Sequence, residues 1–410
     1  MKMNKTMLRK YASLIVRCGA NVQKKQEVVI YSAVDQHDFA LMLAEECYRA
    51  GASEVTMEWT YQPITKLHYK KMTLKKLSEF PAWREEKLKH TSKVLPAAIH
   101  ILSEDPDGLN GIDFEKVAKA RQAIFPKIKP YRTAMENRYQ WTIAAVPSPA
   151  WAKKVFPGER ASAAMKKLWD AIFTTCYVEK DNDPLADWAK RNADFKKRSS
   201  LLNEKHFDYL HYKSKNGTDF KVWLMPESRW GGGSDTTLGG VTFNPNLPTE
   251  EVFTAPCKGR AEGRLVSTKP LSYNGALIEN FEFTFKDGKV VAHKAEKNDD
   301  LLEKMITMDE GAAYLGEVAL VPKGSGVDKC GVLFYETLFD ENASCHIALG
   351  SGYADCLEGF ENMTPDERKE KGLNDSMIHV DFMVGADDLS IVGYKDGKPF
   401  EIFKNGTWAF

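Results

Sequence analysis

The sequence predicts a multidomain α/β protein, with an N-terminal α/β domain over residues 1–205 and a mixed α+β C-terminal domain over residues 206–410. Its 410 residues exceed the size at which a single hydrophobic core usually stops growing. Strand-like and helix-like segments alternate in the first half, which indicates a layered domain with a largely parallel sheet. After residue 206 the character changes to short strands between Gly, Pro and Asn turns. Two domains of different architecture are therefore expected.

The elements of the N-terminal domain are predicted from its apolar segments. Short β-branched runs indicate strands, and a 3.6-residue apolar period indicates helices, with Gly51 as the stop of the first predicted helix. The expected elements are a strand at 27–31, a helix at 36–49, strands at 54–59 and 97–102, a helix at 114–124 and a strand at 141–146. No glycine-rich phosphate loop follows the first strand, so the sequence does not support nucleotide binding.

Two further helical stretches are expected. The lysine-rich segment 66–76 is interleaved with apolar residues and predicts an amphipathic helix with a solvated lysine face. The charged stretch from about 160 to 205 predicts helices that connect the two domains. In the C-terminal domain the expected strands are 209–213, 220–224, 281–285 and 290–294, with loops or hairpins at Gly231–Gly233 and Asp287–Gly288.

Composition and charge exclude several classes of partner. Lys plus Arg equal Asp plus Glu at 57 each, and no long basic tract is present, so nucleic acid and anionic membranes are poor candidates. The N-terminus has no apolar core of signal-peptide length, and no segment approaches the roughly 18 apolar residues of a membrane span. A cytoplasmic location is therefore expected. The 7 cysteines lack Cys-x-x-Cys spacing, which argues against a disulfide framework.

The most informative stretch is the apolar run from Met377 to Val384, which contains His379 and Asp381. Side chains two residues apart on a strand lie on the same face, so the imidazole and the carboxylate are expected to project together. Such a pair is typical of a metal site. It is equally compatible with a histidine that donates a hydrogen bond to a neighbouring carboxylate in an ordinary core.

Similar apolar segments upstream each carry one isolated acid or imidazole. Glu317 lies in the middle of the run 313–321, where an unpaired carboxylate would cost several kcal/mol unless a positive group compensates it. His346 lies in another apolar run, and the pair Glu250–Glu251 precedes a short β-branched and aromatic run. Each of these residues therefore needs a partner that the local sequence does not supply.

Together these segments supply a coherent set of metal ligands, namely Glu251, Glu317, His346, His379 and Asp381. Three carboxylates and two imidazoles without cysteine are expected for two close divalent ions of zinc, cobalt or manganese. Calcium would prefer oxygen ligands alone, and structural zinc would usually recruit thiolates. The alternative is that each residue is explained separately by a hydrogen bond or an ion pair in the core.

The motifs that carry these residues resemble those of the aminopeptidase T/aminopeptidase S family, also called the thermophilic metalloprotease family. They are Asn244–Pro256 (NPNLPTEEVFTAP), Tyr314–Leu320 (YLGEVAL), Glu341–Gly350 (ENASCHIALG) and Met377–Met383 (MIHVDFM). The resemblance covers essentially the whole chain. It implies a broad-specificity metallo-aminopeptidase, a hydrolase that releases N-terminal amino acids from peptides with a free N-terminus. It also implies two co-catalytic divalent metal ions and a homodimer.

The resemblance also assigns roles to residues. The family's metal ligands fall on the same five positions, and its active-site tyrosine falls on Tyr353, whose hydroxyl can donate a hydrogen bond to an oxyanion. A carboxylate must take a proton from water, and both Glu317 and Glu250 are candidates for this base. Two other functions use the same ligand set. One is a different metallohydrolase, such as a dipeptidase or an amidase, and the other is a metal-binding protein without catalytic activity.

Overall fold

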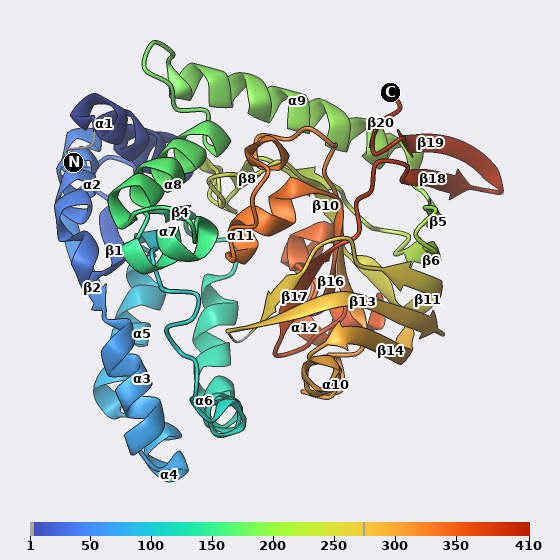
Figure 1. Ribbon diagram of the computed structural model, residues 1–410, viewed down its shortest axis with the longest axis horizontal. Coiled ribbons are helices and arrows are strands. Elements are labelled where there is room, and N and C mark those ends of the chain that lie inside the picture. The colour runs from blue at the N-terminus through green and yellow to red at the C-terminus, as the bar shows by residue number, and fades with distance from the viewer. Residues whose placement is uncertain (1–3, 274) are drawn as a thin grey trace. The chain divides into compact units, whose positions relative to one another are not determined.

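The computed structural model describes residues 4–273 and 275–410 (Figure 1). The chain groups into two compact units, Met1–Ala189 with Ser234–Pro248, and Lys190–Gly233 with Thr249–Phe410. The first unit contains a parallel sheet and the second contains antiparallel sheets, so the expected α/β multidomain class is confirmed. The grouping differs from the expected division after residue 205. The change of unit between Ala189 and Lys190 falls inside one continuous helix, residues 184–205. The composition of that helix therefore gives no sign of the boundary.

The first unit is built on a four-stranded sheet in the order β2-β1-β3-β4, in which all neighbouring strands are parallel. The strands are β1 (Glu27–Ala33), β2 (Glu54–Thr60), β3 (Ala97–Leu102) and β4 (Trp141–Ala145), as the apolar runs predict. The helix after β1, α2 (His37–Ala50), ends at Gly51, whose φ of 107° lies in the left-handed region that favours glycine. The short pair β8 (Asp235–Thr236) and β9 (Thr242–Phe243) also belongs to this unit.

The lysine-rich segment differs from its prediction. Instead of one helix at 66–76, the chain forms α3 (Gln62–Lys71) and then α4 (Leu74–Leu77), because Met72 is extended and the Thr73 side chain caps the second helix. The remaining helices of the unit are α1 (Lys5–Leu14), α5 (Ala82–Val94), α6 (Phe114–Met135), α7 (Pro149–Val155), α8 (Ala161–Thr175) and the start of α9 (Pro184–Lys205). Among the described residues, no helix is both long enough and apolar enough to cross a membrane.

The second unit contains a five-stranded sheet in the order β17-β16-β15-β10-β7, with antiparallel neighbours. Its strands are β7 (Gly231–Gly232), β10 (Val252–Thr254), β15 (Leu315–Leu320), β16 (His346–Gly350) and β17 (His379–Met383). The glycine segment Gly231–Gly233, expected as a loop or hairpin, therefore contributes an edge strand. Its two glycines pair with Val252 and Phe253 of β10.

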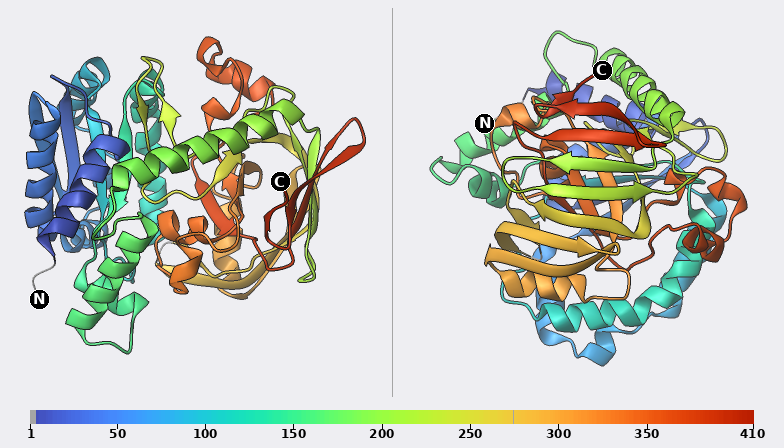
Figure 2. Two further views of the ribbon diagram at one scale, coloured as in Figure 1. Left: turned by 90° about the horizontal axis from the view of Figure 1, so that it is seen from above. Right: turned by 90° about the vertical axis from the view of Figure 1, so that its right-hand side faces the viewer.

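A nine-stranded antiparallel sheet completes the second unit, and its strands lie side by side in the right-hand view of Figure 2. Its strands are β5 (Tyr209–Lys213), β6 (Asp219–Leu224), β11 (Pro256–Val266), β12 (Leu271–Tyr273), β13 (Ala276–Lys286), β14 (Lys289–Lys297), β18 (Ser390–Lys395), β19 (Lys398–Lys404) and β20 (Thr407–Trp408). The expected hairpin at Asp287–Gly288 joins β13 to β14. Short helices in this unit are α10 (Asp299–Ile306), α11 (Thr337–Asp340) and α12 (Pro365–Glu370).

One hydrophobic core lies between these two sheets of the second unit. Phe382 of β17 contacts Phe281 and Phe283 of β13, with ring centroids 5.8 and 5.2 Å apart. Val318 and Ile347 join the same buried cluster from β15 and β16. Because strand side chains alternate between faces, the neighbours of these apolar residues must lie on the opposite face of the five-stranded sheet.

Gly316 allows this sheet to bulge beside the chain that follows β16. The register between β15 and β16 shifts at Leu315/Glu317, and a Cβ at Gly316 would lie 2.6 Å from the Gly350 carbonyl oxygen and closer still to that of Ser351.

We expect Gly316→Ala to lower the free energy of unfolding of the second unit by about 1–3 kcal/mol, since both carbonyl oxygens that the new Cβ would meet belong to the backbone. Gly158→Ala is the control, because a Cβ there meets nothing within 4 Å. Equal urea midpoints for the two variants would contradict this prediction.

Candidate metal centre

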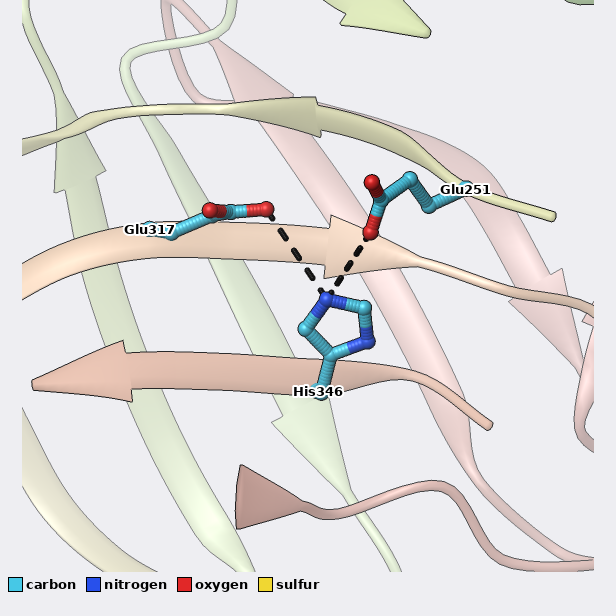
Figure 3. Close-up of side chains that lie close together, drawn as sticks. All are labelled: Glu251, Glu317 and His346. Atoms are coloured by element: carbon cyan, nitrogen blue, oxygen red, sulfur yellow. Dashed lines mark ion pairs between the residues drawn. The ribbon is translucent and has the colours of Figure 1, made fainter. Parts of the chain in front are cut away.

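Five polar side chains lie on the face of the five-stranded sheet opposite the aromatic core. The register places Glu317 opposite Ala348 and Ala348 opposite Asp381, so these side chains form a row across β15, β16 and β17. His346 and His379 lie two residues from members of this row and share their face. Glu251 directly precedes β10 and joins them from the next strand (Figure 3). The structure therefore brings together all five residues that the sequence predicts as metal ligands.

The first group consists of Glu251, Glu317 and His346, all of which are buried. His346 Nε2 lies 3.0 Å from Glu251 Oε2 and 3.8 Å from Glu317 Oε1, as the dashed lines in Figure 3 mark. One potential ligand atom from each residue lies within 4.8 Å of the others. These separations suit a single divalent ion bound at the centre of the three atoms.

The second group consists of Glu317, His379 and Asp381 and meets the same 4.8 Å criterion. His379 Nε2 lies 3.2 Å from Glu317 Oε2 and 3.4 Å from Asp381 Oδ1. Glu317 therefore belongs to both groups and directs one oxygen toward each histidine. Asp381 Oδ1 is buried and has no hydrogen-bond partner among the described residues, which is costly unless a cation binds there.

The backbone orients both imidazoles in the same way. His346 Nδ1 lies 3.2 Å from the Ser344 carbonyl oxygen, and His379 Nδ1 lies 2.7 Å from that of Ser351. A carbonyl oxygen only accepts hydrogen bonds, so each Nδ1 carries the proton in these contacts. Each Nε2 then faces the carboxylates. This arrangement is typical of metal-binding histidines, which donate one ring N–H to a second group and bind the ion with the other nitrogen.

Burial and charge shift the pKa values of these groups in the metal-free chain. Burial and the carboxylates of Glu251 and Asp381, opposed by His379, together raise the pKa of Glu317 to about 7. Burial lowers the pKa of His346, but the carboxylates of Glu251, Asp381 and Glu317 outweigh this effect and raise it to about 10. The crowded carboxylates thus favour positive charge among them, which a bound cation would supply.

Tyr353 lies on the loop that follows β16 and its side chain is exposed. Its ring centroid is 4.8 Å from that of His379 and 6.0 Å from that of Phe253. Phe253 pairs with Ala319 in β15, so its ring belongs to the same face of the sheet as the five polar residues. Tyr353 therefore lies directly beside the second group, with an aromatic neighbour toward β10.

Glu250 has a different environment from the adjacent Glu251. Its Oε2 accepts a hydrogen bond from Arg191 Nη2 at 2.8 Å, and its Oε1 accepts one from the Gly326 amide at 3.0 Å. Its own backbone N–H donates to Asn342 Oδ1 at 2.7 Å. Both carboxylate oxygens of Glu250 are thus engaged away from the two histidines, whereas the carboxylate of Glu251 contacts His346.

Comparison with known proteins identifies the family. A family model described as thermophilic metalloprotease (M29) matches residues 4–408. The chain is a member of this metalloprotease family. It is 41% identical to aminopeptidase AmpS of Bacillus subtilis (strain 168) and 40% identical to aminopeptidase 2 of Geobacillus stearothermophilus, each over 405 residues and 98% of both chains. The solved structure of wild-type AmpT from Thermus thermophilus matches with a TM-score of 0.90 and 38% identity, covering 99% of this chain and 100% of that chain.

The sequence analysis missed one acidic residue of this metalloprotease. Glu341 lies in the short 3-10 turn Glu341–Ala343, and its side chain hydrogen-bonds that of Asp381. Burial and the carboxylates of Asp381 and Glu251 raise the pKa of Glu341 well above its ordinary value. Glu341 belongs to a turn, so the alternation of side chains along a strand could not be used to place it on the same face as the metal ligands. Its position in the polar run Asp340–Asn342, shortly before His346, was the only local signal.

Metal binding by this metalloprotease should release protons. The ligands bind an ion in their deprotonated forms, but the pKa values of about 10 for His346 and about 7 for Glu317 mean that protons must leave first. We expect affinity for zinc to fall by at least about tenfold for each pH unit between pH 8 and pH 6, with a steeper fall below pH 7 where Glu317 is also protonated. Calorimetric titrations in two buffers of different ionisation enthalpy count the protons released. Binding without proton release at pH 7 would contradict this prediction.

Proposed function

We propose that this metalloprotease releases N-terminal amino acids from peptides with broad specificity and that it uses two co-catalytic divalent metal ions. Membership of the metalloprotease family and full-length relatives named as aminopeptidases support metal-dependent aminopeptidase as its function. Peptides with a free N-terminus are the corresponding substrates. The 7 cysteines of the chain are all free thiols, which supports a cytoplasmic location because that compartment keeps thiols reduced.

The proposed metal site uses the two groups on the five-stranded sheet. Glu251 and His346 would hold one ion, His379 and Asp381 would hold the other, and Glu317, which belongs to both groups, would contribute to each. The observation that carries this proposal is the placement of the two Glu317 oxygens, one toward each histidine. A single-ion site would need only one of these groups. Zinc, cobalt and manganese all suit a set of carboxylates and imidazoles.

Two divalent ions at these positions would lower the pKa of a bound water molecule, so that hydroxide is available near neutral pH, and would polarise the scissile carbonyl group. Side chains of the protein would transfer the proton and stabilise the intermediate. Glu317 and Glu250 are the candidates for the base: Glu317 would share its oxygens between the two ions, and the Glu250 carboxylate already binds Arg191 and the Gly326 amide. Whichever of them acts as the base accepts the proton of the attacking water and returns it to the leaving amine. The Tyr353 hydroxyl donates a hydrogen bond to the oxygen of the tetrahedral intermediate.

The first experiment is hydrolysis of leucine, arginine and phenylalanine arylamides by the purified protein, with the N-acetylated forms of the same substrates alongside. Activity on the free amines that disappears with chelation and returns with zinc, cobalt or manganese is expected. Equal activity on the N-acetylated substrates would favour an amidase. Failure on every substrate with metal bound would favour a metal-binding protein without catalytic activity.

Glu317→Gln tests the bridging carboxylate. The amide keeps the shape of the side chain but loses the negative charge that would bind both ions. We expect turnover to fall by at least about a thousandfold and bound metal to decrease, with an unchanged far-UV circular dichroism spectrum. Glu401→Gln, an exposed glutamate on β19, is the control. Full activity of Glu317→Gln would remove this residue from the proposed site.

Tyr353→Phe separates transition-state stabilisation from metal binding. This substitution removes only the hydroxyl and keeps the ring contacts with His379 and Phe253. We expect kcat to fall by about a hundredfold, with metal content and KM nearly unchanged. Steady-state kinetics with metal analysis of the same sample provide the measurement. An unchanged kcat would leave Tyr353 with a packing role.

We also propose that the protein is a homodimer, as the family resemblance implies. A sedimentation measurement at several concentrations tests this directly. The state of assembly is independent of the catalytic proposal, since the two groups of metal ligands belong to one chain and one sheet.

A further inference from the structure

One segment of the first unit lacks the burial that normally stabilises helices. None of residues 51–95, all of which the structure describes, is buried. This segment contains the edge strand β2 and the helices α3, α4 and α5. Helices α3 and α5 have only 10 and 13 residues, and isolated helices of this length are marginal in water without an apolar face to pack. We call residues 62–95 the basic arm; Figure 1 shows its helices beyond the end of β2.

The basic arm and the residues before it expose an apolar stripe. Ile64 and Leu67 lie three residues apart on one face of α3, and Tyr61 is the extended residue directly before this helix; they are 46%, 48% and 47% exposed. Trp59 on the edge strand and Trp83 at the start of α5 are also exposed. An amphipathic surface helix normally turns such a stripe toward its core. Several large apolar side chains exposed along one segment instead suggest an interaction surface.

Charge restricts what this surface can bind. The basic arm contains nine Lys and Arg and three Glu, a net charge of +6 in a chain whose net charge is zero. Packing the arms of two copies against each other would bring +6 against +6, which is unfavourable. An acidic partner surface is therefore required. The second unit of the same chain offers one in residues 355–375, with seven Asp and Glu against three Lys and Arg, a net charge of −4.

We propose that the basic arm of one copy docks on the acidic segment 355–375 of a second copy. The reciprocal contact follows from twofold symmetry, so each dimer contains two equal arm contacts. A stable interface buries about 800 Å² on each partner, and the large side chains exposed on and beside the arm supply much of its apolar part. This proposal rests on the homodimer proposed above and identifies the surfaces that form it. The acidic segment begins two residues after Tyr353, so the contact lies beside the proposed active site in the sequence.

Leu67→Lys tests the apolar part of the contact. This substitution places a charge in the exposed stripe of α3 without disturbing a buried residue. We expect the dimer dissociation constant to rise by roughly tenfold or more. Leu41→Lys in α2 is the matched control, because Leu41 is 62% exposed on a helix of the same unit but outside the arm. Equal dissociation constants for these two variants would overturn the proposal.

A charge exchange tests the pairing of the two surfaces. The first variant carries Lys70→Glu and Lys71→Glu in the arm, and the second carries Glu361→Lys and Glu370→Lys in the acidic segment; all four positions are exposed. The first pair of substitutions lowers the net charge of the arm from +6 to +2, and the second raises that of the acidic segment from −4 to 0. Each variant alone therefore has two weakened contacts and should dissociate at concentrations where the parent protein is dimeric. In a mixture, the heterodimer keeps one contact with the parental charges of +6 and −4. We expect mixing to restore dimers, with weaker restoration at high salt.

The possible outcomes distinguish the arm-to-segment contact from the homodimer itself. Dimers restored only in the mixture would support the arm-to-segment contact. Two variants that stay dimeric alone, or that fail to pair when mixed, would overturn it while leaving a homodimer through another surface. A monomeric parent protein would overturn the homodimer itself. Arylamide hydrolysis by the same samples reports on the catalytic proposal independently of all three outcomes.

Discussion

The metal centre depends on one electrostatic constraint, the burial of three carboxylates on a single face of a sheet. Carboxylates at this depth are stable only beside positive charge. In the metal-free chain two imidazoles provide it, and His346 Nε2 lies 3.0 Å from Glu251 Oε2. The same carboxylates raise the pKa of His346 to about 10, against the effect of its burial. Divalent ions would neutralise the buried carboxylates with more positive charge than the imidazoles carry. Their binding would allow the imidazoles to lose a proton and become neutral ligands.

The opposite face of the same sheet fixes where these charges lie. Phe382 packs against both Phe281 and Phe283, and Ile347 and Val318 join the same core. A shift of one residue in the register of β17 would bury Asp381 in that core and expose Phe382. The packing that fixes the strand register on the apolar face therefore also fixes the positions of the polar side chains on the other face. The small side chain of Ala348 leaves room between Glu317 and Asp381, which lie opposite it on the two neighbouring strands.

The sequence predicted the parts of the site that depend on strand alternation. The spacing of His379 and Asp381 was sufficient to place them together, and an acid within an apolar run identified Glu317. The role of Glu250 could not be predicted, because its partner Arg191 is distant in the sequence and only the fold brings its guanidinium to the carboxylate. Glu341 was missed for a related reason, since it approaches Asp381 from a turn that has no periodic pattern.

The fold shows the same division between local and distant information. The four parallel strands were predicted from their own apolar runs, whereas the edge strand β7 was not, because glycine has no side chain to pattern and its pairing depends on β10. The lysine-rich segment 66–76 was predicted to form an amphipathic helix with a solvated lysine face, and none of its residues is buried. Periodicity identifies an apolar stripe but does not state what covers it.

The exposed arm also shows why the net charge of a whole chain is a weak guide to its partners. A total of zero excludes strong attraction to polyanions only if charges of both signs are mixed over the surface. Here the basic arm carries +6 and the acidic segment carries −4, and the two belong to different units. Such a separation favours association between copies of one chain, because each copy brings both signs. A neutral protein with this distribution is self-complementary, and the exposed stripe of α3 gives that attraction an apolar surface to bury.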